Sequence, residues 1–226
     1  MKFRPEVKPF LYASAAFGAV MVLLFLLFGV SWGTSLFFGL LLANISAGYM
    51  LFFFRDPDRA TPSDPGLIVA AASGKLARIT EIYEGEYLKT DTIRISIFLS
   101  LFDVHVNRFP IGGKSSFLGY FPGKRLFTFD EKASDVNQHN SILVEGEGTA
   151  CLIRQIVGPV CRRVVYWLRP DRAVTVRRGQ RFGMMKFGSR LDMYFPKGSI
   201  EMLAQVGEQL TAGTTIIARI VGAKDE

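Results

Sequence analysis

The chain carries no charged side chain between Phe10 and Phe54, and this stretch limits what its N-terminal part can fold into. Two apolar segments, at about 10–30 and 34–54, are separated by a short Ser-Trp-Gly sequence that permits a tight turn. A helix of roughly 20 apolar residues crosses the hydrocarbon core of a bilayer, which is about 30 Å thick. Each segment is long enough to cross once, so residues 1–55 are predicted to form a transmembrane helical hairpin.

Two other interpretations of this stretch fit less well. A single span would exceed the usual length of a membrane helix, and a cleaved signal peptide would need a small-residue cleavage site leading into a polar chain. Basic residues flank the hairpin, with Lys2, Arg4 and Lys8 before it and Arg55 and Arg59 after it. Because positively charged flanks stay in the cytoplasm, the rest of the chain is expected on the cytoplasmic face of the cell (inner) membrane.

The remainder of the chain is basic, and the 226 residues together have a formal net charge of +7. Its C-terminal half contains a series of cations: Arg162, Arg163, Arg169, Arg172, Arg177, Arg178, Arg181, Lys186 and Arg190. A basic surface is attracted to an anionic lipid leaflet, and no nucleic-acid-binding motif is present in the sequence. A membrane phospholipid is therefore the expected partner and nucleic acid is not; a merely solvated basic face is the simpler alternative.

Cysteine and histidine are scarce. The two cysteines, Cys151 and Cys161, are ten positions apart, and the two histidines are His105 and His139. A structural zinc site needs closer ligand pairs and more ligands than this. No metal site is predicted, and the cysteines are expected to be reduced thiols in the cytoplasm.

The composition changes after the hairpin. The sequence RDPDRATPSDPG is rich in Pro and Asp, so residues 56–66 are predicted to form a linker. Residues 67–226 then contain short β-branched or aromatic runs separated by Gly, Pro or Asn: LIVAAA, KLARITEIY, IRISIFLS, SILVEGEG, TACLIRQIV, RRVVYWL and RLDMYF. This pattern predicts a mainly β domain, arranged as a sandwich or barrel, with C-terminal hairpins like those of hammerhead carrier domains.

His105 is the first candidate for chemistry, since histidine titrates near neutral pH and can donate or accept a proton. In the sequence FLSLFDVHVNRFP it lies between Asp103 and Asn107. If this run is a strand, residues 103, 105 and 107 share one face. A carboxylate, an imidazole and an amide on one face indicate a site, whereas a lone histidine in an apolar strand is more often structural.

The Gly188-Ser189 pair in KFGSRLDMYFP is the second candidate. A serine hydroxyl can attack the carbonyl carbon of the preceding residue and convert the peptide bond into an ester. β-Elimination then leaves a dehydroalanine, which hydrolyses to a pyruvoyl group. Glycine before the serine permits the close approach and strained backbone that this reaction needs. Gly-Ser alone is far more often an ordinary turn, so the support must come from the rest of the chain.

Four segments occur together in this chain: FFFRDPDR, FLSLFDVHVNRFPIGG, RQIVGPVCRRVVYW and RRGQRFGMMKFGSRLDMYFP. In this order they resemble the short, membrane-anchored form of bacterial and archaeal phosphatidylserine decarboxylase, from about residue 52 to residue 220. The resemblance implies decarboxylation of phosphatidylserine to phosphatidylethanolamine, in phospholipid biosynthesis. It also implies autocatalytic cleavage between Gly188 and Ser189, with Ser189 becoming a covalent pyruvoyl cofactor.

The same resemblance suggests roles for other residues. The cleaved chains, with the shorter one starting at Ser189, would remain associated, and His105 is the candidate proton donor. The candidate cations for the phosphate and carboxylate of the substrate are Arg108, Arg162, Arg163, Lys186 and Arg190. The sequence leaves open whether copies of the chain form a homo-oligomer.

This sequence departs from the family at one position that matters for cleavage. The family carries a PADGK-like segment whose aspartate works with a histidine and the serine, but here the sequence is AAASGK and Ser73 stands at the aspartate position. Serine can form a hydrogen bond but supplies no negative charge to a histidine. Two hypotheses follow: an active decarboxylase that matures slowly or uses Asp103 or His139 in compensation, and an unprocessed, non-catalytic homologue that binds lipid or a partner at the membrane.

Overall fold

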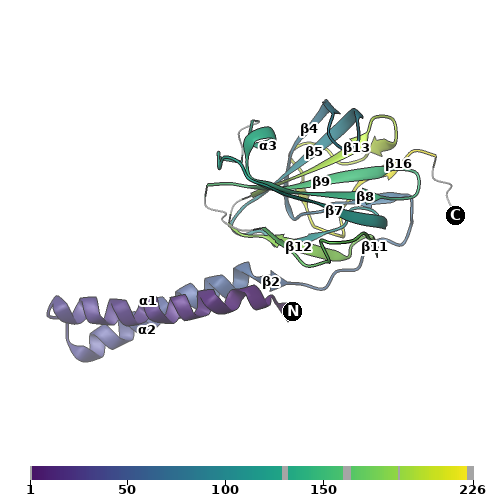
Figure 1. Ribbon diagram of the computed structural model, residues 1–226. Helices are drawn as coiled ribbons and strands as arrows, with labels where there is room; N and C mark the ends of the chain where they lie inside the picture. The colour runs from purple at the N-terminus through teal and green to yellow at the C-terminus, as the bar shows by residue number, and fades with distance from the viewer. Residues whose placement is uncertain (1, 129–131, 160–163, 188, 223–226) are drawn as a thin grey trace. The chain divides into compact units, whose positions relative to one another are not determined.

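The computed structural model describes residues 2–128, 132–159, 164–187 and 189–222 (Figure 1). The chain divides into two compact units, one ending at Asp58 and the other beginning at Arg59. The segment predicted as a linker is therefore shared between them, because Arg59 and the residues after it pack with the second unit. We describe each unit by itself.

The first unit is a helical hairpin. It contains the single-turn helix η1 (Pro5–Val7) and the helices α1 (Lys8–Leu27) and α2 (Trp32–Phe53). Both long helices are of a length and composition that can cross a membrane, with mean hydropathies of 2.4 for Pro5–Leu27 and 1.9 for Trp32–Phe53. Ser31 begins α2 as its N-cap and accepts a hydrogen bond from the backbone N–H of Thr34 at 3.4 Å.

Small residues let the two helices approach closely. A Cβ atom added to Gly18 would lie 2.6 Å from the Cβ of Ala43, and one added to Gly39 would overlap the side chain of Val22. The hydroxyls of Ser14 and Ser46 are hydrogen-bonded across the helix pair at 2.9 Å. This is how helices pack in lipid, where apolar burial between them gains little and close van der Waals contact gains more.

The two ends of the hairpin are joined to each other. Strand β1 (Lys2–Phe3) pairs antiparallel with β2 (Arg55–Asp56). The guanidinium of Arg4 forms an ion pair with the nearly buried carboxylate of Asp56 at 3.3 Å. The N-terminal residues therefore lie beside the residues that follow α2, so both ends of the hairpin are on the same side of it.

The second unit is built almost entirely from strands. These are β3 (Leu67–Val69), β4 (Gly74–Glu84), β5 (Thr90–Leu99), β6 (Val106–Arg108), β7 (Gly113–Phe121), β8 (His139–Glu145), β9 (Ala150–Val157), β10 (Val164–Tyr166), β11 (Val174–Val176), β12 (Arg181–Met185), β13 (Ser189–Pro196), β14 (Ile200–Met202), β15 (Gln209–Leu210) and β16 (Ile216–Ile220), with one short helix, α3 (Ala133–Val136). The large sheet has the order β11-β7-β8-β9-β13-β5-β4-β15, and the two small sheets have the orders β10-β12-β6 and β14-β16-β3. Figure 1 shows β13 in the middle of the large sheet, between β5 and β9.

Alternation along the central strands explains the core. In β5, Ile95, Ile97 and Leu99 are fully buried in one apolar cluster. Leu191 and Met193 of β13 enter the same cluster, as does Phe182 of β12 in a small sheet. Successive side chains of a strand point to opposite faces, so this core lies between the large sheet and the small ones. The predicted fold class, a mainly β domain after an apolar helical hairpin, is confirmed.

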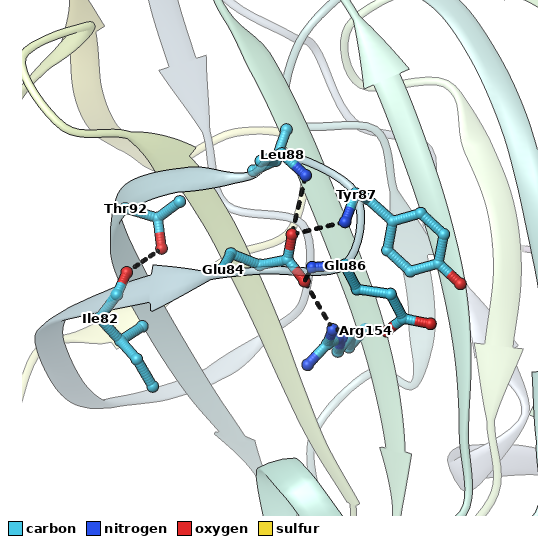
Figure 2. Close-up of polar contacts among 7 residues, drawn as sticks. All are labelled: Ile82, Glu84, Glu86, Tyr87, Leu88, Thr92 and Arg154. Atoms are coloured by element: carbon cyan, nitrogen blue, oxygen red, sulfur yellow. Dashed lines mark hydrogen bonds and ion pairs between the residues drawn. The ribbon is translucent and has the colours of Figure 1, made fainter.

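A buried carboxylate holds the turn between β4 and β5 (Figure 2). Glu84 accepts hydrogen bonds from the backbone N–H groups of Tyr87 at 2.9 Å and Leu88 at 2.8 Å. It also forms an ion pair with Arg154 of β9 at 3.0 Å, with only 3% of the glutamate side chain exposed. Glu84 therefore links this turn to a strand on the other side of β13.

We expect Glu84→Ala to lower the free energy of unfolding by about 3 kcal/mol, because the part-buried N–H groups of Tyr87 and Leu88 lose their acceptor and Arg154 loses its buried partner. Denaturant unfolding of the full chain in detergent micelles measures this. The matched control is Glu86→Ala, since Glu86 contacts the same arginine at 3.4 Å but is 51% exposed. Solvent screening should limit its effect to about 0.5 kcal/mol. Equal losses in the two variants would contradict the role given to Glu84.

Candidate active site

Ser189 is the first residue of β13 and is fully buried. It pairs with Leu99 of β5 on one side and with Val157 of β9 on the other. Directly paired residues share a face of the sheet, so the serine lies on the apolar face. Within the part of the chain that the structure describes, its Oγ has no hydrogen-bond partner. A buried hydroxyl without a partner costs free energy, and this one belongs to the serine predicted to react.

The backbone just before this serine is strained. Phe187 has φ = 60°, in the left-handed region that bulky side chains rarely adopt. Such a conformation costs on the order of 1–2 kcal/mol and clusters at functional sites. Gly188 itself lies outside the described residues, so the geometry of the predicted cleavage bond is not described.

His105 is fully buried and lies just before β6. Its backbone carbonyl accepts a hydrogen bond from the N–H of Met185, four positions before Ser189, at 3.2 Å. Its Nδ1 lies 3.0 Å from the backbone carbonyl oxygen of Asp103. A carbonyl can only accept, so in this contact Nδ1 carries the proton. Nε2 is then the ring nitrogen that can take up a proton, as in a serine–histidine pair.

The prediction that residues 103, 105 and 107 share one strand face is wrong. The chain turns between β5 and β6, and the strand begins only at Val106. The carboxylate of Asp103 accepts hydrogen bonds from the N–H and Oγ of Ser100 at 2.8 and 2.7 Å. The His105 ring is instead contacted by the backbone carbonyl of Asp103. The short polar side chains compete with strand formation by bonding to the local backbone.

Asn107 has a different partner, which the sequence did not reveal. Its Oδ1 accepts a hydrogen bond from Nε2 of Gln155, on β9, at 2.7 Å, and both side chains are fully buried. Gln155 is two positions before Val157, so it shares the face of the large sheet on which Ser189 lies. This bond joins β6 to the large sheet near the serine. A glutamine in an apolar run carries no signal of such a contact.

Ser73 stands immediately before β4 and is nearly buried. Its hydroxyl accepts hydrogen bonds from the backbone N–H of Ala212 at 3.1 Å and from Nη1 of Arg59 at 2.9 Å. The next residue, Gly74, has φ = 149°, and a Cβ there would lie 2.1 Å from the carbonyl oxygen of Phe98. Gly74 thus lies against β5 on one side, while Ser189 pairs with β5 on the other. The same two donors, the N–H of Ala212 and the guanidinium of Arg59, could also bind a carboxylate side chain at this position.

The predicted substrate cations are not all together. Arg190 lies on the opposite face from Ser189, where its Nε is 3.1 Å from Oδ1 of the buried Asp192 and its Nη1 donates to the carbonyl of Thr128 at 3.0 Å. Arg190 and Asp192 therefore form a buried ion pair on the face of the sheet opposite Ser189. Ser134 also contacts this pair through its hydroxyl.

Arg108 is nearly buried on β6, with its Nη1 donating to the carbonyl of Gly179 at 2.9 Å. Lys186 is half-buried, directly after β12. Arg162 and Arg163 lie outside the described residues, as does Cys161.

His139, the other histidine, does not lie with the serine. It pairs with Ile156, which pairs in turn with Arg190, so its side chain is on the face opposite Ser189. Its Nδ1 lies 2.8 Å from the carbonyl of Asn137, and its ring stacks on Phe121. The idea that His139 replaces the missing carboxylate is therefore wrong on geometric grounds.

Among the described residues, no group of three or more His, Cys, Asp or Glu side chains is arranged to hold a metal ion. Cys151 is a free, fully buried thiol, and burial raises its pKa well above the ordinary value. It therefore behaves as a small apolar residue of the core.

Comparison with known proteins identifies similar chains. Residues 47–218 match the family model described as phosphatidylserine decarboxylase. A phosphatidylserine decarboxylase proenzyme of Carboxydothermus hydrogenoformans is 40% identical over 174 residues, covering 77% of this chain and 81% of that protein. Proteins with the same name are 44% identical in Salinibacter ruber, covering 80% of each chain, and 38% identical in Ruegeria pomeroyi, covering 95% of this chain and 93% of that protein. No solved structure matches.

His139 is partly buried in the folded chain. Loss of hydration is the largest effect on the pKa of His139 and lowers it below 6.5. The charge of Arg154 also lowers this pKa. The Asn137 carbonyl and the carboxylates of Glu86 and Asp192 raise it, but by less. The unfolded chain then binds more protons than the folded chain as the pH falls below about 6.5, so folding stability decreases there.

We expect the thermal midpoint of the wild-type chain to fall more between about pH 7.5 and about pH 5.5 than that of His139→Asn, which has no imidazole to protonate. Thermal unfolding in detergent at the two pH values measures the difference. The same fall in both chains would contradict the assignment.

Proposed function

The chain belongs to the phosphatidylserine decarboxylase family, and we propose that it is a carboxy-lyase that converts phosphatidylserine into phosphatidylethanolamine in phospholipid biosynthesis. The observation that supports the proposal most is the environment of the Ser189 hydroxyl. Its hydroxyl is buried and has no hydrogen-bond partner among the described residues, and the strained Phe187 precedes it by two positions. Strain before the bond and a serine hydroxyl that no described residue binds both support self-cleavage.

Maturation uses groups of this chain and one water molecule, which supplies the ketone oxygen of the pyruvoyl group. Oγ of Ser189 attacks the carbonyl carbon of Gly188, and the peptide C–N bond breaks as the ester forms. β-Elimination returns the ester oxygen to Gly188 as a carboxylate, and hydrolysis of the dehydroalanine releases ammonia and leaves the pyruvoyl group. His105 is the candidate to accept the hydroxyl proton through Nε2, since its Nδ1 is bonded to a carbonyl.

The surroundings of Ser189 suit a pyruvoyl group, which supplies an electron sink for the pair left when CO2 departs. Leu99 and Val157 flank the residue on the same face and are fully buried, so they exclude water from it. In the decarboxylation, His105 delivers the proton that replaces CO2 on the substrate carbon. Arg108 is the described candidate for holding the substrate phosphate, because guanidinium groups bind phosphate through paired N–H donors.

Cleavage would leave the two chains associated. The shorter chain would begin with β13, a strand that is hydrogen-bonded to β5 and to β9 of the longer chain. Its later strands pair with that chain as well, β15 with β4 and β16 with β3. Breaking one peptide bond removes none of these contacts.

We also propose that the hairpin anchors the protein in the cell (inner) membrane, with the β unit on the cytoplasmic face. The joined ends of the hairpin support this, because β1 and β2 pair at one side of it. Lys2, Arg4 and Arg55 belong to that side, and basic flanks remain in the cytoplasm. Two spans with both ends on one side would keep the site near the headgroups of its substrate.

An unprocessed, lipid-binding homologue is the second candidate function, and Ser73 favours it. A hydroxyl at this position accepts hydrogen bonds from Ala212 and Arg59 but brings no negative charge to the site. Loss of the charged member of a triad can slow a reaction by about 10⁴-fold. Slow cleavage and absence of cleavage are distinguished by the following measurements.

We expect the purified wild-type protein to give two masses under denaturing conditions, one for residues 1–188 and one for residues 189–226 with a pyruvoyl-blocked end. Ser189→Ala should give only the full-length chain, because it lacks the attacking hydroxyl. Ser63→Ala, at an exposed serine of the same unit, is the control and should be cleaved like the wild type. A wild-type chain that stays uncleaved after long incubation would overturn the decarboxylase proposal in favour of the lipid-binding alternative.

Ser73→Asp should accelerate cleavage by about tenfold or more, since it restores a carboxylate where one is expected to support the histidine. Pulse–chase labelling of the full-length chain measures the rate. Ser73→Asn is the matched control, with nearly the same shape and no charge. An unchanged rate in Ser73→Asp, or an equal gain in Ser73→Asn, would show that a missing charge at this position does not limit cleavage.

A further inference from the structure

The second unit contains a pocket of about 490 Å³ whose wall is dominated by arginine. The arginines are Arg59, Arg108, Arg177, Arg178 and Arg181. None of the residues that line it in the described part of the chain is Asp or Glu. Like charges repel when they are brought together, so a fold gathers this many guanidinium groups around one space at an electrostatic cost. An anion in the pocket would offset that cost.

Contacts to neutral oxygens fix several of these side chains in place. Arg178 donates from Nη1 to the carbonyl of Leu67 at 2.6 Å and from Nη2 to the carbonyl of Pro62 at 2.5 Å. Arg59 donates from Nη1 to the carbonyl of Ala212 at 2.7 Å, and Arg108 makes the bond to Gly179 described above. These bonds orient the guanidinium groups around the pocket, and the planar fork of a guanidinium matches the geometry of phosphate oxygens.

The backbone builds the pocket from two distant segments. Gly179 has φ = 74°, and a Cβ there would overlap the side chain of Thr61. The turn that carries Arg177 and Arg178 therefore packs directly on the segment that follows the second apolar helix. Arg59 comes only six positions after Phe53, the last residue of α2, so the chain leaving the candidate membrane span itself supplies part of the wall.

Two side chains indicate that the pocket can bind an anion. Arg177 is exposed to solvent and also lines the pocket. Burial lowers the pKa of Arg178, and the carboxylate of Asp64 partly offsets this. A bound anion would act in the same direction as Asp64, by stabilising the charged guanidinium.

We propose that this pocket binds a phosphate group, supplied either by the headgroup of a membrane phospholipid or by free inorganic phosphate. Planar guanidinium groups recognise phosphate oxygens through paired hydrogen bonds. The cations that line this pocket are all arginines, which bind phosphate with this defined geometry, whereas a lysine acts as a point charge. The lipid source rests on the proposed function, since Arg59 also binds the hydroxyl of Ser73 and so connects the pocket to the candidate active site. The phosphate chemistry itself does not depend on cleavage.

The test uses the full-length Ser189→Ala protein, which cannot be cleaved, so binding is measured whether or not the wild type matures. One arm measures inorganic phosphate binding to the protein in neutral detergent by calorimetry. The other measures binding to vesicles of phosphatidylcholine with and without phosphatidylglycerol. Each arm compares Arg177→Gln with Arg169→Gln, which removes the same charge from an exposed arginine outside the pocket.

We expect Arg177→Gln to weaken binding about tenfold, the effect of one lost charge-assisted hydrogen bond, with Arg169→Gln within about twofold of its parent. Selective weakening in the vesicle arm alone assigns the phosphate to a lipid headgroup, and weakening in the phosphate arm assigns it to free phosphate. Both results support the site. Equal effects of the two variants in both arms, or no binding in either, would overturn it, whereas self-cleavage at Ser189 is tested separately by the masses of the wild-type protein.

Discussion

The pairing of β13 with strands on both sides is the constraint on which the rest of the second unit depends. This strand is hydrogen-bonded to β5 along eight residues and to β9 along six. Because its register is set from both edges, each side chain is assigned to one face. Ser189 is thereby held on the apolar face, next to the turn that carries His105, and Arg190 is held on the other. A slip of one residue would exchange them.

The two faces of this strand are used for different purposes. Leu191 and Met193 enter the apolar core together with the reactive serine, so the environment of Ser189 excludes water. On the other face, the ion pair of Arg190 and Asp192 is buried and connected to Thr128 and Ser134. A buried ion pair is weak evidence for stability, because its desolvation offsets its attraction, and breaking it by removing one partner is costly. A one-residue slip of β13 would break this pair as well as move the serine to the other face.

Local pattern was enough for some features and not for others. The strands around LIVAAA, IRISIFLS and TACLIRQIV could be predicted because they are short apolar runs that include β-branched residues and are bounded by turn-forming residues. The pattern around His105 favours a strand, but the side chains of Ser100 and Asp103 are hydrogen-bonded to each other and the chain turns before Val106. The contact between Asn107 and Gln155 could not be predicted, because it joins residues 48 positions apart in different sheets.

The sequence by itself determined the apolar hairpin, the mainly β character of the second unit and the family, since each depends on composition, short periodicity or the order of local motifs. Only the tertiary structure decided which residues meet. It separated Arg190 and His139 from Ser189 by the alternation of paired strands, and it joined Arg59 to Ser73 and to the arginines of a distant turn. Such contacts depend on register and on the packing of sheets, and these are set by long-range hydrogen bonds and burial that no local pattern encodes.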